Sequence, residues 1–195
     1  MQHFCQNIHG WFTFPELYKA VANHYPDESH FVEIGVWKGK SAAFMAVELV
    51  NQNKNIKFDC IDTWDGSEEH LDPTSGHYEP KLVEDKDYLY NHFLENIAPV
   101  KHIINPIRKA SLDAVSLYKD ESLDFIFIDA AHDYENVMKD IKAWYPKTKL
   151  TTGIIAGHDI SHGPIRQAVS EFFGNLNLKI QESEDCWIVV NDHNS

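Results

Sequence analysis

The stretch 31–41, FVEIGVWKGKS, constrains the fold of this chain more than any other. Its first six residues are mostly apolar with a single acid, Glu33, which predicts a strand buried on both faces, as in a parallel sheet. Gly35 and Gly39 bracket a tight turn, and apolar residues recur at helical spacing through 41–50. Such a corner lets the backbone approach a nucleotide-like ligand, although it also fits a plain turn between a strand and a helix.

Strands and helices are expected to alternate along most of the chain. After the first strand, further parallel strands are expected at 58–62, 103–107, 123–129 and 153–159. Helices are expected at 11–25, 41–50, 86–98, 111–118, 134–144 and 164–173. This alternation predicts a parallel sheet with right-handed crossovers. Two closing strands, near 176–181 and 186–190, have no helix between them and should pair antiparallel at one edge.

The length of 195 residues and a hydrophobic content of 43% fit one α/β domain, 1–195, with a filled core. Residues 66–85 are polar, acidic and rich in turn formers, so we expect a long loop or lid there. The helix within 1–26 is expected to cover the sheet or the mouth of a ligand site, and its aromatic residues would permit a homodimer.

Charge and composition restrict the partners. A net charge of −13 argues against nucleic acid and against an anionic membrane surface. The apolar runs are too short to span a bilayer, and the first residues do not have the pattern of a signal peptide. The three cysteines are scattered and are expected to be reduced thiols. These features together favour a cytoplasmic protein that binds a small molecule.

In an open α/β sheet, ligands gather at the carboxyl ends of the strands. Asp62 ends the second strand, about 20 residues beyond the glycine turn, where a carboxylate suits a bidentate hydrogen bond to a ribose diol. The alternative is that Asp62 only caps the turn that follows it.

Asp129 and Asp159 end two apolar strands that should be neighbours, so both carboxylates can reach one point. Two carboxylates at one point require a shared proton or a cation. His158 precedes Asp159, and His132 follows Asp129 by three residues. This set fits Mg²⁺ or Mn²⁺ and, less specifically, Fe²⁺ or Zn²⁺, whereas a lone histidine after a strand is more often structural.

Four segments in order resemble a known family: 32–41 (VEIGVWKGKS), 60–67 (CIDTWDGS), 123–134 (LDFIFIDAAHDY) and 153–159 (GIIAGHD). They are similar to class I S-adenosylmethionine-dependent methyltransferases. The branch is that of the macrocin- and mycinamicin-type sugar O-methyltransferases and the cephalosporin-hydroxylase-like proteins. The likeness runs from about residue 11 to residue 173.

The resemblance implies a Rossmann-like, seven-stranded sheet with a reversed last strand and helices on both faces, in agreement with the pattern of elements. It implies an S-adenosylmethionine site in which Asp62 holds the ribose and Ser111 lies near the adenine. The expected cofactor residues are Glu33, Gly35, Trp37, Gly39, Ser41, Asp62, Ser111 and Asp129.

In the metal-using members, an acid matching Asp129 and a tandem acidic pair bind Mg²⁺, and the histidine matching His132 is the general base. This chain departs from that pattern, with His158 and Asp159 in place of two acids. The resemblance therefore implies a metal site of Asp129, His158 and Asp159 with altered affinity or ion identity. Thr151 and Thr152 also replace the usual Pro-Gly start of the turn before the fifth strand, which should matter little for chemistry.

The expected reaction is methyl transfer to a hydroxyl of a small molecule or sugar, with His132 as the base and a divalent metal assisting. One rival is a nicotinamide-dependent oxidoreductase, disfavoured because the glycines lack the Gly-x-Gly-x-x-Gly spacing. The other is a non-catalytic module that keeps the fold and binds a cofactor or ligand.

Overall fold

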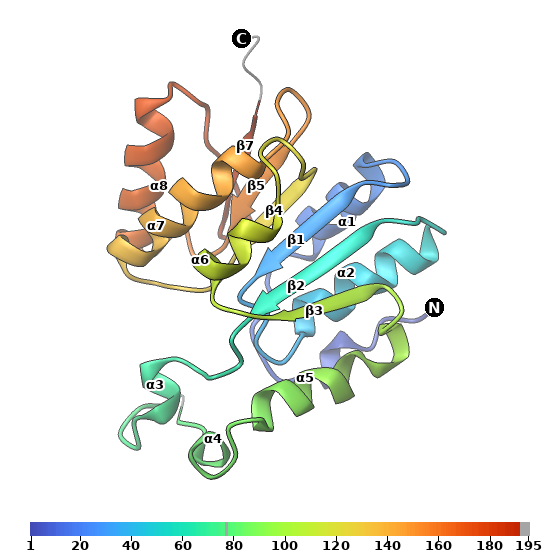
Figure 1. Ribbon diagram of the computed structural model, residues 1–195, viewed down its shortest axis with the longest axis vertical. Coiled ribbons are helices and arrows are strands. Elements are labelled where there is room, and N and C mark those ends of the chain that lie inside the picture. The colour runs from blue at the N-terminus through green and yellow to red at the C-terminus, as the bar shows by residue number, and fades with distance from the viewer. Residues whose placement is uncertain (77, 192–195) are drawn as a thin grey trace.

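The structure, a computed structural model, describes residues 1–76 and 78–191 (Figure 1). Its centre is a seven-stranded sheet with the strand order β3-β2-β1-β4-β5-β7-β6. The strands are β1 His30–Ile34, β2 Lys57–Asp62, β3 Ile104–Arg108, β4 Phe125–Ile128, β5 Ile154–Gly157, β6 Gln181–Ser183 and β7 Cys186–Val190. Strands β1 to β5 pair in parallel, and β7 is antiparallel to both of its neighbours. The Rossmann-like sheet with a reversed last strand is therefore confirmed.

Helices cover both faces of this sheet (Figure 1). The α-helices are α1 Pro15–His24, α2 Lys40–Asn51, α3 Glu68–Leu71, α4 Pro80–Glu84, α5 Tyr88–Ile97, α6 Ser111–Ala114, α7 Tyr134–Trp144 and α8 Gly163–Asn175. Short 3-10 turns are η1 Cys5–Asn7, η2 Ala98–Val100, η3 Val115–Leu117 and η4 Tyr145–Lys147. Within the described ranges, no helix combines the length and apolarity that a membrane crossing requires.

The central strand β4 explains how two core layers form. Phe125 and Phe127 pack into the layer under α1, α2 and α5, while Ile126 and Ile128 pack into the layer under α7 and α8. All four side chains are buried. A strand covered on both faces has no solvent side, and this is why its sequence shows no alternation of apolar and polar residues.

Several elements differ from their expected bounds by a few residues; the helix expected at 11–25, for example, begins only at Pro15. Three of the differences follow from a turn or from added helices. The first strand ends at Ile34 rather than at residue 36, because Gly35 turns the chain with φ +81°. The stretch 66–85 is not only loop, since it includes α3 and α4, which project beyond the carboxyl ends of β1 and β2 (Figure 1).

The third difference is at the first closing strand, which was expected near 176–181 and forms only at Gln181–Ser183. Helix α8 runs on to Asn175, and the chain then reverses through Asn177 with φ +56°. The amide of Leu178 donates to the carbonyl oxygen of Phe173 at 3.0 Å. This turn occupies residues that the hydrophobic pattern favoured as strand.

Candidate active site

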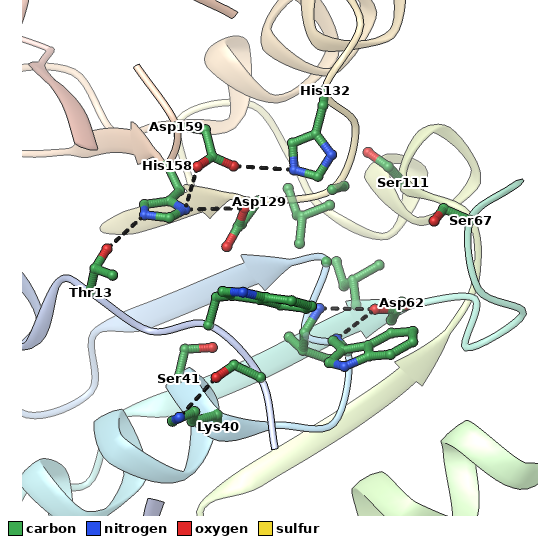
Figure 2. A pocket seen from close by; sticks show the side chains of 18 of the residues that line it. Thr13, Lys40, Ser41, Asp62, Ser67, Ser111, Asp129, His132, His158 and Asp159 are labelled. Carbon is green, nitrogen blue, oxygen red and sulfur yellow. Dashed lines mark hydrogen bonds and ion pairs between the residues drawn. The ribbon is translucent and has the colours of Figure 1, made fainter. Parts of the chain in front are cut away.

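A cavity of about 1120 Å³ opens at the carboxyl ends of the parallel strands (Figure 2). The turns after β1, β2, β4 and β5 form most of its wall, and the N-terminal segment before α1 and the turn between β6 and β7 complete it. Of the residues expected to form the site, those that line the cavity are Gly35, Trp37, Ser41, Asp62, Ser111, Asp129, His132, His158 and Asp159.

The two glycines of the first turn allow close packing of the chain against itself. A Cβ at Gly35 would lie 2.2 Å from the carbonyl oxygen of Asp129, so a side chain there would collide with the backbone after β4. Gly39, with φ +83°, precedes α2, and a Cβ there would lie 2.9 Å from the ring of Phe93 on α5. Gly39 does not line the cavity. Both glycines are thus required by packing, rather than by the approach of a ligand alone.

Asp62 at the end of β2 holds the turn after β1 in place. Its Oδ2 accepts the amides of Val36 and Trp37, each at 2.9 Å, and its Oδ1 accepts the amide of Trp64 at 2.8 Å. Both tryptophans have positive φ, +47° and +55°, which bulky residues seldom adopt. Burial raises the pKa of Asp62, and the amide donors oppose this. Oδ2 already accepts two amides, whereas Oδ1 accepts one and can accept another hydrogen bond. The expected hydrogen bond from a ribose hydroxyl to Oδ1 remains a prediction.

Glu33 lies one layer below the cavity and does not line it. The side chain is buried, and its Oε1 accepts the hydroxyl hydrogen of Ser41. Its Oε2 has no hydrogen-bond partner among the described residues. Burial, which outweighs the bond from Ser41, raises the pKa of Glu33 to about 8. Glu33 is therefore largely protonated near pH 7, and it lies beneath the cavity, where it holds Ser41 in place.

Three ligand-type side chains meet at the tips of β4 and β5. Within the described part of the chain, Asp129, His158 and Asp159 place ligand atoms within 4.8 Å of one another. His158 Nδ1 lies 3.2 Å from Asp159 Oδ1 and 3.8 Å from Asp129 Oδ1. The other nitrogen, Nε2, lies 2.8 Å from the Thr13 hydroxyl, which orients the ring (Figure 2). We name these three side chains the Asp-His-Asp cluster.

The electrostatics of the Asp-His-Asp cluster favour a cation. Burial and the charge of Asp159 raise the pKa of Asp129 to about 6, although His158 and His132 oppose this. Hydrogen bonds from His132 and His158 lower the pKa of Asp159. Burial lowers the pKa of His158, but the two carboxylates outweigh it and the net change is upward. A divalent ion would neutralise both carboxylates and use the unprotonated Nδ1.

His132 lies at the mouth beside this cluster. Its side chain is half exposed, and its Nε2 lies 3.2 Å from Asp159 Oδ2 (Figure 2). A histidine so placed can exchange protons with a ligand in the cavity while the carboxylate fixes its ring. Ser111, which also lines the cavity, donates its hydroxyl to Asp140 and accepts the indole N–H of Trp144 at 2.8 Å.

Residues of 66–84 also reach the cavity. The imidazole of His70 stacks on the indole of Trp37 with ring centroids 4.0 Å apart. The buried ammonium of Lys38 pairs with Glu79 at 2.8 Å and joins this segment to the turn after β1. The expected lid thus forms part of the cavity wall, through Gly66, Ser67 and His70.

Four further residues of the wall were not among the expected site residues, although the helix expected from residue 11 was assigned to the sheet or the ligand mouth. Trp11 and Thr13 precede α1, and Glu184 and Asp185 form the turn between β6 and β7. None of these four residues belongs to a sequence motif, because neither segment has residues at a spacing typical of a known site. Their available signal was weak: an aromatic residue before a proline-started helix and a pair of acids in a two-residue turn.

Comparison with known proteins agrees with this geometry. A family model described as "Methyltransferase domain" matches residues 32–160. Among solved structures, the O-methyltransferase NovP aligns over 92% of this chain and 79% of its own, with 14% identity and a TM-score of 0.68.

Two further structures are similar. A Staphylococcus aureus protein provisionally described as a caffeoyl-CoA O-methyltransferase aligns over 95% of this chain and 87% of its own, with 14% identity and a TM-score of 0.63. CalS11, a TDP-rhamnose 3'-O-methyltransferase of calicheamicin biosynthesis, aligns over 90% and 76%, with 12% identity and a TM-score of 0.58. At these identities the likeness shows a shared fold.

Proposed function

The chain belongs to the methyltransferase-domain family as an S-adenosylmethionine-dependent methyltransferase, and from this we propose that it methylates a hydroxyl of a small molecule or sugar with divalent-metal assistance. The observation that carries the proposal is the Asp-His-Asp cluster beside His132, across the cavity from the turn after β1. The O-methyltransferase descriptions of NovP and CalS11 support the choice of a hydroxyl acceptor.

Polar groups of the cavity wall suit the cofactor. The buried indole N–H of Trp37 has no hydrogen-bond partner among the described residues, and an acceptor atom on a ligand in the cavity would supply one. Asp62 Oδ1 can take a further donor, and Ser41 and Ser111 add hydroxyls to the wall. S-adenosylmethionine supplies an electrophilic methyl group on its sulfonium. The chain contributes by holding that group and the acceptor in line.

Asp129, Asp159 and His158 would hold the metal. Two oxygens and one imidazole nitrogen suit Mn²⁺ or Mg²⁺, and Thr13 orients the histidine from behind. A divalent cation supplies positive charge that lowers the pKa of a bound hydroxyl. His132, at the mouth beside Asp159, accepts the proton of the acceptor hydroxyl.

The test combines metal binding with turnover. Titration of the purified protein with Mn²⁺, followed by the paramagnetic resonance of the free ion, is expected to show one strong site. Asp159→Asn should weaken that site by about tenfold or more. The control is Asp120→Asn, an exposed carboxylate bonded to Lys147. Turnover of hydroxylated acceptors should fall after exhaustive chelation and return with Mg²⁺ or Mn²⁺.

Two results would contradict the proposal. Full activity after chelation would remove the metal from the mechanism. Binding of S-adenosylmethionine without turnover of any hydroxylated sugar, polyol or catechol would favour a non-catalytic binding module.

A further inference from the structure

His158 supplies the one nitrogen of the Asp-His-Asp cluster, and its ring is held in a single orientation. Only 9% of the side chain is exposed, and the ring of Phe14 packs against it with ring centroids 4.9 Å apart. Its amide, directly after β5, donates to the Ile128 carbonyl oxygen at 3.2 Å. These contacts keep Nδ1 turned toward Asp159 and Asp129, at 3.2 and 3.8 Å.

Thr13 contacts the opposite nitrogen of the ring. Its hydroxyl lies 2.8 Å from Nε2 of His158 (Figure 2). Within residues 1–76 and 78–191, this hydroxyl is the one hydrogen-bond partner of Nε2. A neutral imidazole carries hydrogen on one nitrogen and has a free lone pair on the other. For Nδ1 to bind a cation, Nε2 must therefore carry the hydrogen, and the Thr13 oxygen is placed to accept it.

Without that oxygen the ring has a better alternative. A hydrogen on Nε2 would lack an acceptor, which is costly in so buried a side chain. The hydrogen would instead favour Nδ1, because the Asp159 carboxylate lies 3.2 Å away and can accept it. In that form no lone pair faces the cluster and the ring cannot bind a metal. The Thr13 oxygen thus favours the form of His158 that can.

The N-terminal segment fixes the position of Thr13. Phe14 is fully buried and packs on Phe127 of β4, with ring centroids 4.6 Å apart. From the other end of the chain, Glu184 accepts the amide of Leu17 in the first turn of α1 at 2.9 Å. Thr13 itself is exposed at the cavity wall. Replacing its hydroxyl therefore removes a hydrogen bond but little core packing.

The donor atoms decide which ions the cluster prefers. Mg²⁺ prefers oxygen ligands and keeps several of its waters, so the two carboxylates alone can hold it. Imidazole nitrogen favours Fe²⁺, Co²⁺ and Zn²⁺, and affinities of divalent ions generally rise from Mn²⁺ to these later ions. A ring that presents Nδ1 correctly raises the affinity for the later ions more than the affinity for Mg²⁺.

We propose that Thr13 is a positioning residue for His158, and that the cluster thereby selects nitrogen-preferring ions, Fe²⁺, Co²⁺ or Zn²⁺, over Mg²⁺, with Mn²⁺ between them. The inference rests on the proposed function and names the kind of ion that its metal site takes. Thr13 acts on the ion only through the ring of His158.

Displacement of Mn²⁺ measures the preference. Metal-free protein is loaded with Mn²⁺, and Mg²⁺, Co²⁺ or Zn²⁺ is added while the paramagnetic resonance of free Mn²⁺ is followed. Co²⁺ and Zn²⁺ should displace Mn²⁺ at concentrations about 100-fold or more below that of Mg²⁺. His158→Asp makes the donors all oxygen and should narrow this ratio by about tenfold or more.

Substitutions at Thr13 test its role. Thr13→Val keeps the shape of the side chain but removes the oxygen, and should weaken Co²⁺ binding by about tenfold or more. Mg²⁺ binding should change by less than about threefold, because the carboxylates hold that ion. Thr13→Ser keeps a hydroxyl and should retain Co²⁺ binding. Thr63→Val is the control, the same change on the cavity wall after β2, which β1 separates from β4.

A spectroscopic measurement separates positioning from general damage to the structure. Pulsed paramagnetic resonance of bound Mn²⁺ detects a nitrogen that is coordinated directly. We expect this nitrogen coupling in the wild type and in Thr13→Ser, its loss in His158→Asp, and a much smaller amplitude in Thr13→Val. A substitution that only destabilised the fold would reduce the amount of bound Mn²⁺ and leave the coupling of the remaining ion unchanged.

The outcomes separate the inference from the function on which it rests. Two results would overturn the inference: no nitrogen coupling in the wild type, or equal weakening of Co²⁺ and Mg²⁺ in Thr13→Val. Both leave metal-assisted O-methylation intact if Asp159→Asn still removes a Mn²⁺ site. Failure of all four ions to bind would overturn the inference together with the metal assistance in the proposed function.

Discussion

At the scale of single residues, Gly35 is needed because two stretches of backbone nearly touch. A Cβ there would lie 2.2 Å from the Asp129 carbonyl oxygen, and φ is +81°. We expect Gly35→Ala to lower the free energy of unfolding by about 2–5 kcal/mol, from left-handed strain and overpacking. Urea unfolding measures this, with Gly163→Ala as the control, since a Cβ there meets nothing within 4 Å. Normal stability with weakened S-adenosylmethionine binding would show instead that the glycine serves only the ligand.

A substitution at His132 tests the proposed chemistry most directly. His132→Ala should lower kcat by about 10²–10⁴-fold, because the proton acceptor is lost, and leave the affinity for S-adenosylhomocysteine unchanged. His102→Ala, an exposed histidine before β3, is the control and should behave as the wild type.

Two other results would assign His132 a different role. A variant that melts early yet turns over normally would make it structural. Recovery of the rate by excess Mn²⁺ would make it a metal ligand.

At the scale of elements, Asp59 joins three parts of the chain on the α7 side of the sheet. This β2 carboxylate accepts from His30 of β1 at 2.7 Å, from Asn105 of β3 at 2.8 Å and from the Tyr118 hydroxyl at 2.9 Å. Burial alone would raise the pKa of Asp59, but these hydrogen bonds outweigh it and lower the pKa to about 2. Because the folded-state pKa is depressed, the stabilisation is present above the unfolded-state value and is lost as pH falls toward the folded-state value.

The expected contribution of the Asp59 charge at pH 7 is about 2 kcal/mol. Asp59→Asn should therefore be less stable than the wild type by about that amount at pH 7 in urea unfolding, and the gap should close between about pH 4 and pH 2. Asp113→Asn, an exposed carboxylate on α6, is the control and should show no such gap. A gap that persists at pH 2 would assign the effect to packing rather than charge.

At the scale of the whole molecule, the cavity wall is drawn from the N-terminal segment, the segments after all five parallel strands and the last hairpin. A ligand that fills it therefore stabilises elements from both ends of the described chain. At about 100 times its dissociation constant, S-adenosylhomocysteine should add about 2.7 kcal/mol and raise Tm by about 5–10 °C. NADH should leave Tm unchanged, and a shift with NADH instead would revive the nicotinamide alternative.

Much of this architecture could be predicted from local patterns. Continuous apolar runs such as 123–129 indicated buried parallel strands, and alternation with helices indicated the sheet. Because parallel strands end at one edge, Asp62, Asp129 and Asp159 could be assigned to one site before any contact was known. The fold, the family and the meeting of Asp129, His158 and Asp159 were within reach of the sequence for that reason.

Other features were decided only by tertiary packing. Thr13 contacts His158 across 145 positions of sequence, and Glu184 holds the start of α1 at Leu17 from the far end of the chain. Glu33, assigned to the cofactor by its motif, lies beneath the cavity because its position on β1 points it toward the α2 layer and Ser41. Periodicity specifies which face of an element is buried, but not which distant segment covers it. The segments that complete the cavity wall around the parallel strands therefore follow from the packed structure alone.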